Sequence, residues 1–202
     1  MRKSGWVRAL LLGALLAGGV GAVTAQQSVV QELVRLVVAS SDNAGQPFAI
    51  VDKRGATLNV YTADGHLVAT TPALLGIAPG DVSAPGVAQR VQTGLAVDDR
   101  TTPAGRFVSE PGRNLKGEHV VWVDYGSAFA IHRMRPSAAR ERREERLASA
   151  TPDDNRISLG CVVVSVQFYE QVVYPMLGQR KALVYVLPES GSIAEMFALT
   201  AH

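Results

Sequence analysis

The residues best suited to chemistry in this sequence are one cysteine and one histidine. Cys161 is the only cysteine among 202 residues, and it ends the run Ser158-Leu159-Gly160-Cys161. His132 ends a separate apolar run, residues 128–131. A thiol must lose its proton to attack an acyl carbon, and a neighbouring imidazole is a common base for that step. The two residues therefore predict a cysteine nucleophile with its general base, and a buried structural cysteine is the alternative.

Short β-like runs must position this pair. They are bounded by turn residues and alternate with loops, as expected for a mainly β domain, and they cover residues 48–51, 57–62, 67–71, 119–123, 128–132 and 183–187. The first three are separated by tight turns and predict an antiparallel meander. Residues 76–100 are rich in glycine and proline and predict irregular surface structure.

Three segments predict helices. Apolar residues at helical spacing indicate an amphipathic helix over residues 28–39, which leads into the domain. Ser165 is placed to cap a helix over residues 166–174 that stops near Pro175. Residues 140–146 alternate in charge and sum to +4 − 3 = +1, which is typical of a solvated helix; their position between His132 and Cys161 also allows a lid beside the site.

Residues 1–25 have the pattern of an export signal, with a basic start, an apolar stretch and small residues at the end. A retained membrane anchor is the alternative. Removing this segment takes three of the 20 Lys+Arg and none of the 18 Asp+Glu, so the remaining charge is 17 − 18 = −1. A near-neutral surface gives no electrostatic reason to expect nucleic acid. We expect an exported protein of the periplasm or cell envelope.

A metal site built from Cys161, His132 and Asp153 or Asp154 lacks a recognisable ligand spacing. We therefore expect no metal and no other cofactor. A single cysteine also excludes an internal disulfide. The sequence leaves the oligomeric state open.

Four segments, taken in order, resemble the catalytic domain of the L,D-transpeptidases, the YkuD domain of peptidoglycan-modifying enzymes. They are residues 58–61 through 65–68, 102–107, 130–132 and 158–161. The resemblance implies a mixed β-sandwich or barrel with a few peripheral helices. The resemblance covers residues 47–188. Together with the expected signal and N-terminal helix, it divides the chain into a signal peptide (1–25), an N-terminal helix and loop (26–46), a catalytic domain (47–188) and a C-terminal helix or tail (189–202).

The resemblance also implies roles for individual residues. Cys161 would attack the carbonyl between the third residue of a peptidoglycan stem peptide and its terminal D-alanine, with His132 as the base. A thioester would remain, and an amine of a second stem peptide would convert it into a 3-3 cross-link; water as acceptor would give an L,D-carboxypeptidase. Amides around Gly160 and Cys161 would hold the oxyanion, Ser158 would organise the loop, and the Arg133 carbonyl would orient the imidazole.

Two departures from the family pattern favour a different reading. Arg133 stands where glycine is common, and Val163 replaces the arginine or asparagine that is common two positions after the nucleophile. Trp122 and Tyr125 are candidates for lining the donor groove, although aromatic residues at strand ends are often core. A catalytically impaired cell-wall-binding protein of the same fold is therefore the alternative to the enzyme.

Overall fold

The computed structural model describes residues 18–197. Residues 1–17 of the expected signal and residues 198–202 of the expected C-terminal tail lie outside this range, and residues 18–25 form the first turns of helix α1 (Gly18–Ala39). Within the described range, no helix combines the length and hydropathy needed to cross a bilayer. The expected division into a signal, a catalytic domain and a tail stays a prediction.

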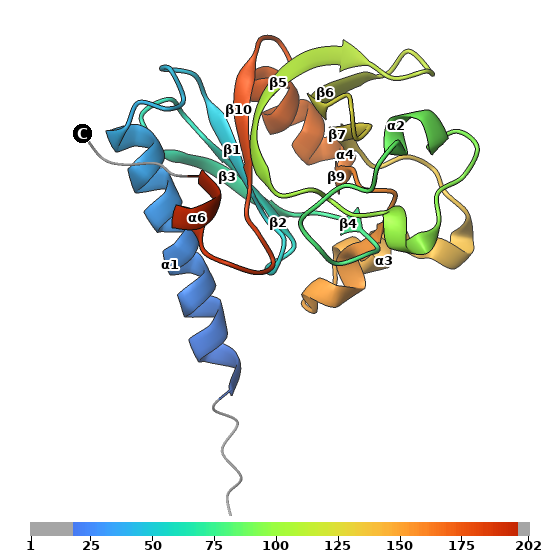
Figure 1. The fold of residues 1–202 in the computed structure, drawn as a ribbon, viewed down its shortest axis with the longest axis horizontal. Helices are drawn as coiled ribbons and strands as arrows, with labels where there is room; N and C mark the ends of the chain where they lie inside the picture. Colours follow the sequence, from blue (N-terminus) through green and yellow to red (C-terminus); the bar gives the residue numbers. More distant parts are fainter. Residues whose placement is uncertain (1–17, 198–202) are drawn as a thin grey trace, which may run out of the picture.

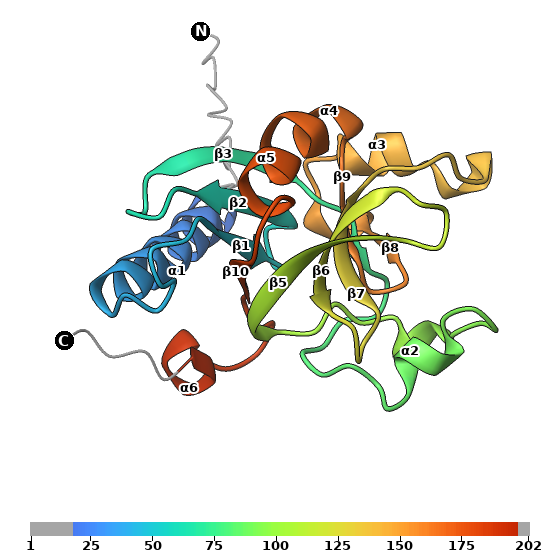
Figure 2. The ribbon, with the colours of Figure 1, turned by 90° about the horizontal axis from the view of Figure 1, so that it is seen from above.

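The architecture is dominated by one strongly bent eight-stranded sheet, with a separate two-stranded pair (Figures 1 and 2). The order in the large sheet is β3-β2-β1-β10-β5-β6-β7-β9, and the pair is β4-β8. The strands are β1 (Phe48–Asp52), β2 (Thr57–Tyr61), β3 (Leu67–Pro72), β4 (Leu75–Gly76), β5 (Gly105–Arg113), β6 (His119–Asp124), β7 (Phe129–Arg133), β8 (Arg156–Ser158), β9 (Val162–Val164) and β10 (Ala182–Val186). The expected mainly β class and the antiparallel β1-β2-β3 meander are both confirmed.

Strand β5 joins the two halves of the sheet and was not expected as a strand. Its first half, Gly105–Ser109, pairs with β10, and its second half, Glu110–Arg113, pairs with β6. In the second half β5 has a partner on one side only, so Pro111, which has no N–H, occupies it without losing a ladder hydrogen bond. Proline and glycine are both uncommon in strands, so the local residue pattern does not predict this one.

The sheet buries a different core on each face of β1. Ala49 and Val51 face the main core, which includes Tyr169 and Val173 of the helical segment after β9. Phe48 and Ile50 face a second core that α1 covers, with α6 (Ile193–Phe197) beside it (Figure 1). The alternation of side chains along a strand explains this division.

The segment after β9 is helical for longer than the sequence predicts. Ser165 caps its start, as expected, because its Oγ accepts a hydrogen bond from Phe168 N at 3.1 Å. Helix α4 (Val166–Phe168) continues as a π-helical turn over residues 169–173 and then as α5 (Tyr174–Leu177). Pro175 therefore does not stop the helix, because it sits in the first turn after the π-helical segment, where a missing N–H costs little.

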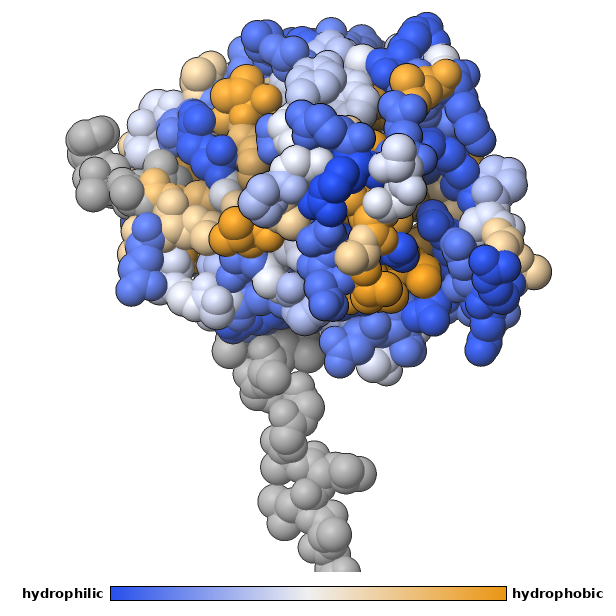
Figure 3. All heavy atoms as spheres, turned by 45° about the vertical axis from the view of Figure 1, so that its right-hand side comes forward, coloured by the Kyte–Doolittle hydropathy of each residue, from blue (hydrophilic) through white to orange (hydrophobic). Residues whose placement is uncertain are grey.

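The remaining helices are short. They are α2 (Val87–Arg90) and the 3-10 turn Val97–Asp99 in the glycine-rich stretch, and the 3-10 turns Ala139–Glu141 and Pro152–Asn155 on either side of α3 (Arg143–Leu147). The surface seen in Figure 3 is mostly hydrophilic, with apolar residues in separate patches. This side of the described chain thus carries no continuous apolar band.

Replacing Leu33 by alanine tests whether α1 is an integral part of the fold. Leu33 is fully buried in the core between α1 and β1, so we expect Leu33→Ala to lower the free energy of unfolding by about 2–5 kcal/mol. Val38→Ala, on the exposed side of the same helix, should change it by no more than about 0.5 kcal/mol. Urea unfolding followed by circular dichroism measures both; equal effects would mean that α1 does not pack as described.

Candidate active site

The pairing of β7 with β9 places His132 and Cys161 on one face of the sheet. The two strands are parallel, with Ile131 opposite Val162, and both of these side chains lie in the main core. His132 in β7 and Cys161, directly before β9, flank this core-facing pair, so alternation turns both toward the opposite face. Cys161 also packs against the apolar cluster that contains Val163 on that face.

The imidazole of His132 is held in one orientation by the backbone. Its Nδ1 lies 2.8 Å from the carbonyl oxygen of Arg133, and since a carbonyl can only accept, Nδ1 carries the proton. The other ring nitrogen, Nε2, is then the free basic atom. This contact matches the one expected from the resemblance.

The thiol and the imidazole are both neutral in the free protein. Burial lowers the pKa of His132 to about 4, and the positive charges of Arg135 and Arg143 act in the same direction. Burial raises the pKa of the Cys161 thiol, against the opposing effects of a backbone hydrogen bond from Ala130 and the charge of Arg135. A preformed thiolate is therefore not favoured, because desolvation penalises both charged forms.

The thiol is directed to the backbone in this structure. Cys161 Sγ donates to the carbonyl oxygen of Ala128 at 3.5 Å. Ala128 has a φ of +51°, which is unusual for a residue with a side chain. The thiol must turn away from this carbonyl before it can pass its proton to His132.

Ser158 closes the loop that carries the nucleophile. Its Oγ donates to the carbonyl oxygen of Cys161 at 2.6 Å and accepts from the N–H of Gly160 at 3.1 Å. Because the Gly160 N–H is already engaged, it is not a free donor for an oxyanion. Of the two amides expected to hold the oxyanion, the Cys161 N–H is the better candidate.

Gly160 and Thr102 meet on the other side of this loop. Gly160 has a φ of +130°, and a Cβ at this position would lie 2.8 Å from the carbonyl oxygen of Thr101, so only glycine fits. Thr102 Oγ1 donates to the carbonyl oxygen of Gly160 at 2.8 Å and accepts from the N–H of Gly76 at 2.8 Å. Thr102 belongs to a segment of the resemblance, but no residue pattern indicated a role for its hydroxyl.

Trp122 and Tyr125 form a stacked aromatic pair. Their ring centroids are 4.8 Å apart with an interplanar angle of 28°. Trp122 pairs with Ala130 across β6 and β7 and lies on the same face as His132. Tyr125 is 56% exposed, so the pair presents an open aromatic surface on the side expected for the donor.

The side chain of Val163 is part of an apolar cluster. It is buried with Leu74 and Leu147, against Met134 and Ile157. The charged segment, expected as a solvated helix, does present ion pairs to solvent. Leu147, the last residue of α3, is nevertheless buried and packs against Val163. The apolar side chain of Val163 thus packs against Leu147, at the end of this charged segment.

Arg133 uses its side chain away from the imidazole. Its guanidinium pairs with Glu170 at 2.6 Å and with Glu118 at 3.4 Å, and Glu118 also pairs with Arg135 at 2.8 Å. Only its backbone carbonyl serves His132. Replacing the common glycine by arginine therefore leaves the orienting contact intact.

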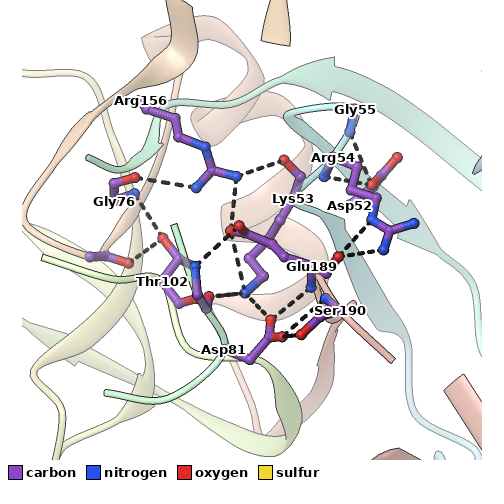
Figure 4. A network of polar contacts seen from close by, with 12 residues as sticks. Asp52, Lys53, Arg54, Gly55, Gly76, Asp81, Thr102, Arg156, Glu189 and Ser190 are labelled. Carbon is purple, nitrogen blue, oxygen red and sulfur yellow. Dashed lines mark hydrogen bonds and ion pairs between the residues drawn. The ribbon is translucent and has the colours of Figure 1, made fainter. Parts of the chain in front are cut away.

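A network of charged side chains surrounds the buried Lys53 (Figure 4). Its members come from four distant parts of the chain, and sequence reasoning missed it because each looked like a turn or surface residue: Lys53, Asp81, Arg156 and Glu189. No local pattern identifies such a network. In residues 18–197, no three metal-ligating side chains gather at one point.

Comparisons with known proteins give matches among solved structures only; no family model and no curated protein matches the chain. The matching structures are mainly L,D-transpeptidases. An L,D-transpeptidase from Mycobacterium smegmatis is 15% identical, with a TM-score of 0.45 over 70% of this chain and 58% of that chain. The helical cell shape determining protein Pgp2 from Campylobacter jejuni is 16% identical, with a TM-score of 0.48 over 73% of this chain and 49% of that one. This chain thus spans less than two thirds of either protein, and the likeness, one of overall fold, assigns no residue a role.

Proposed function

We propose that this protein is an exported cysteine acyltransferase of the L,D-transpeptidase type that acts on peptidoglycan stem peptides in the cell envelope. The observation that supports it most is the pair of Cys161 and His132 on one face of β7 and β9, with Nδ1 of the imidazole fixed by the Arg133 carbonyl. This leaves Nε2 on the ring edge as the base, which the chemistry requires.

The first half-reaction forms a thioester. The thiol proton of Cys161 passes to His132 Nε2 as sulfur attacks the carbonyl carbon before the terminal D-alanine. The Cys161 N–H accommodates the negative oxygen of the tetrahedral intermediate. The carbon–nitrogen bond then breaks, the imidazolium returns its proton to the departing amine, and D-alanine leaves.

The second half-reaction regenerates the thiol. An amine of a second stem peptide attacks the thioester and gives its proton to His132, the carbon–sulfur bond breaks, and the proton returns to sulfur. The product is a 3-3 cross-link. Water in place of the amine yields a carboxylic acid, so the acceptor alone separates the transpeptidase from the L,D-carboxypeptidase.

The second candidate is a cell-wall-binding protein of the same fold. The raised pKa of the partly buried thiol and its hydrogen bond to Ala128 favour this candidate, since both disfavour thiolate. The stacked Trp122 and Tyr125 would serve a bound glycan or peptide in either case. The two functions differ in whether Cys161 forms a covalent intermediate.

Incubation with a purified disaccharide-tetrapeptide tests the proposed activity. We expect the wild-type protein to release D-alanine and form a dimer with a 3-3 bond, and Cys161→Ala to do neither, because the thioester cannot form. Mass spectrometry follows the products. D-alanine release without dimer would assign a carboxypeptidase; absence of both, with the thiol reduced and the fold intact by circular dichroism, would overturn the enzyme in favour of the binding protein.

The pH profile tests His132 as the base. Its lowered pKa of about 4 means that the imidazole is neutral, and able to accept a proton, at all pH values above about 4. We therefore expect kcat/KM for D-alanine release to fall on the acid side near pH 4 and not near 6.5. His132→Gln should lower kcat/KM by about 100-fold or more and remove this acid limb. A limb near pH 6.5 in the folded wild type would contradict the desolvated imidazole described here.

A further inference from the structure

Lys53, directly after β1, is fully buried and uses all its donors. Its Nζ donates to the carbonyl oxygen of Gly80 at 2.6 Å, to Asp81 Oδ1 at 2.7 Å and to the carbonyl oxygen of Thr102 at 3.1 Å (Figure 4). An ammonium group has three protons, so each one has an acceptor. A buried charge is tolerated only with such complete pairing.

The partners of Lys53 are themselves held from other parts of the chain. Asp81 Oδ1 accepts from the N–H of Glu189 at 2.7 Å, and Glu189 Oε2 accepts from the N–H of Gly80 at 3.1 Å. Glu189 also forms an ion pair with Arg156 at 2.9 Å, at the start of β8. The glycine-rich loop, the segment after β10 and the strand before the nucleophile are thereby joined.

Thr102 connects this network to the nucleophile. Its carbonyl oxygen accepts from Lys53, while its hydroxyl donates to the carbonyl oxygen of Gly160. Thr102 is 1% exposed, so water does not compete for these bonds. Gly76 completes the arrangement by donating its N–H to the same hydroxyl.

The hydrogen bond from Thr102 to the Gly160 carbonyl bears on the chemistry because the next atom in the same peptide unit is the N–H donor of Cys161. A peptide unit is planar and trans, so its C=O and its N–H point in opposite directions. The hydroxyl of Thr102 fixes the Gly160 C=O and thus also fixes the direction of the Cys161 N–H. That N–H is the one left for an oxyanion, because Ser158 occupies the N–H of Gly160.

We propose that Thr102, held in place by Lys53, is a positioning residue that aims the Cys161 N–H at the oxyanion of the acylation step. This inference rests on the proposed acyl chemistry and adds the residue that organises it. Thr102 does not touch the substrate. Its effect should appear in reactions that build negative charge on a carbonyl oxygen and not in reactions that need only the thiol.

Two small reagents separate these cases on the full protein. Acylation of Cys161 by p-nitrophenyl acetate passes through a tetrahedral oxyanion, whereas alkylation by iodoacetamide does not. Thr102→Val keeps the shape of the side chain but removes the hydroxyl, and Thr102→Ser keeps the hydroxyl. Rates are measured at pH 9 and at a temperature below the onset of thermal unfolding of each variant. The rate of Cys161→Ala is subtracted as the background that does not involve this thiol.

We expect Thr102→Val to slow acylation by about 10-fold or more. This is less than the roughly 100- to 1000-fold loss of rate that follows complete removal of an oxyanion donor, because the Cys161 N–H is still present. The alkylation rate of this variant should stay within about 2-fold of wild type, and Thr102→Ser should recover acylation to within about 3-fold. Lys53→Met should slow acylation selectively as well, because it releases the Thr102 carbonyl.

Equal slowing of both reagents in Thr102→Val would overturn the proposal, since it would indicate a displaced thiol; so would unchanged acylation. These outcomes do not depend on peptidoglycan. If the wild type fails to release D-alanine from the tetrapeptide but the selective effect on acylation is present, the transpeptidase is wrong and the positioning role stands. If D-alanine is released but Thr102→Val does not slow acylation selectively, the acyl chemistry stands and the positioning role of Thr102 is wrong.

Discussion

The in-register pairing of Ile131 with Val162 is the contact on which the candidate site depends. These residues are far apart in the sequence, and both are fully buried in the main core. A shift of one residue in this parallel pairing would turn one neighbouring side chain toward the core and separate the imidazole from the thiol. Hydrophobic burial on one face of the sheet thus fixes the polar arrangement on the other.

The same burial sets the chemical character of the site. Desolvation keeps both His132 and Cys161 uncharged in the free protein. A neutral pair protects the thiol from unwanted oxidation, because thiolate is the reactive form. The cost is that proton transfer must accompany attack on the carbonyl, which makes stabilisation of the oxyanion correspondingly important.

Around this pair, the chain uses contacts that differ from those the family resemblance suggests. Val163 joins Leu147 in an apolar cluster, so the segment between β7 and β9 is fixed by packing at that point. The charge on Lys53 is neutralised by Asp81. Thr102 accepts a hydrogen bond from Lys53 and donates one to Gly160, and so links the two residues. Removing one partner would leave the other charge unpaired. The free energy of unfolding lost in this way is larger than the net contribution of the intact pair.

The sequence by itself determined the mainly β class, most of the strands, the Ser165 cap and the identity of the two residues suited to acyl chemistry. These follow from alternation, turn residues and residue chemistry, which act over a few positions. The tertiary structure decided what depends on distant partners. Pro111 lies in a strand because β5 is unpaired on one side there, and Pro175 lies within a helix because a π-helical turn precedes it. Only the fold joined Lys53 and Thr102 to Gly160, because a buried charge finds its partners through chain topology, which local propensity does not encode.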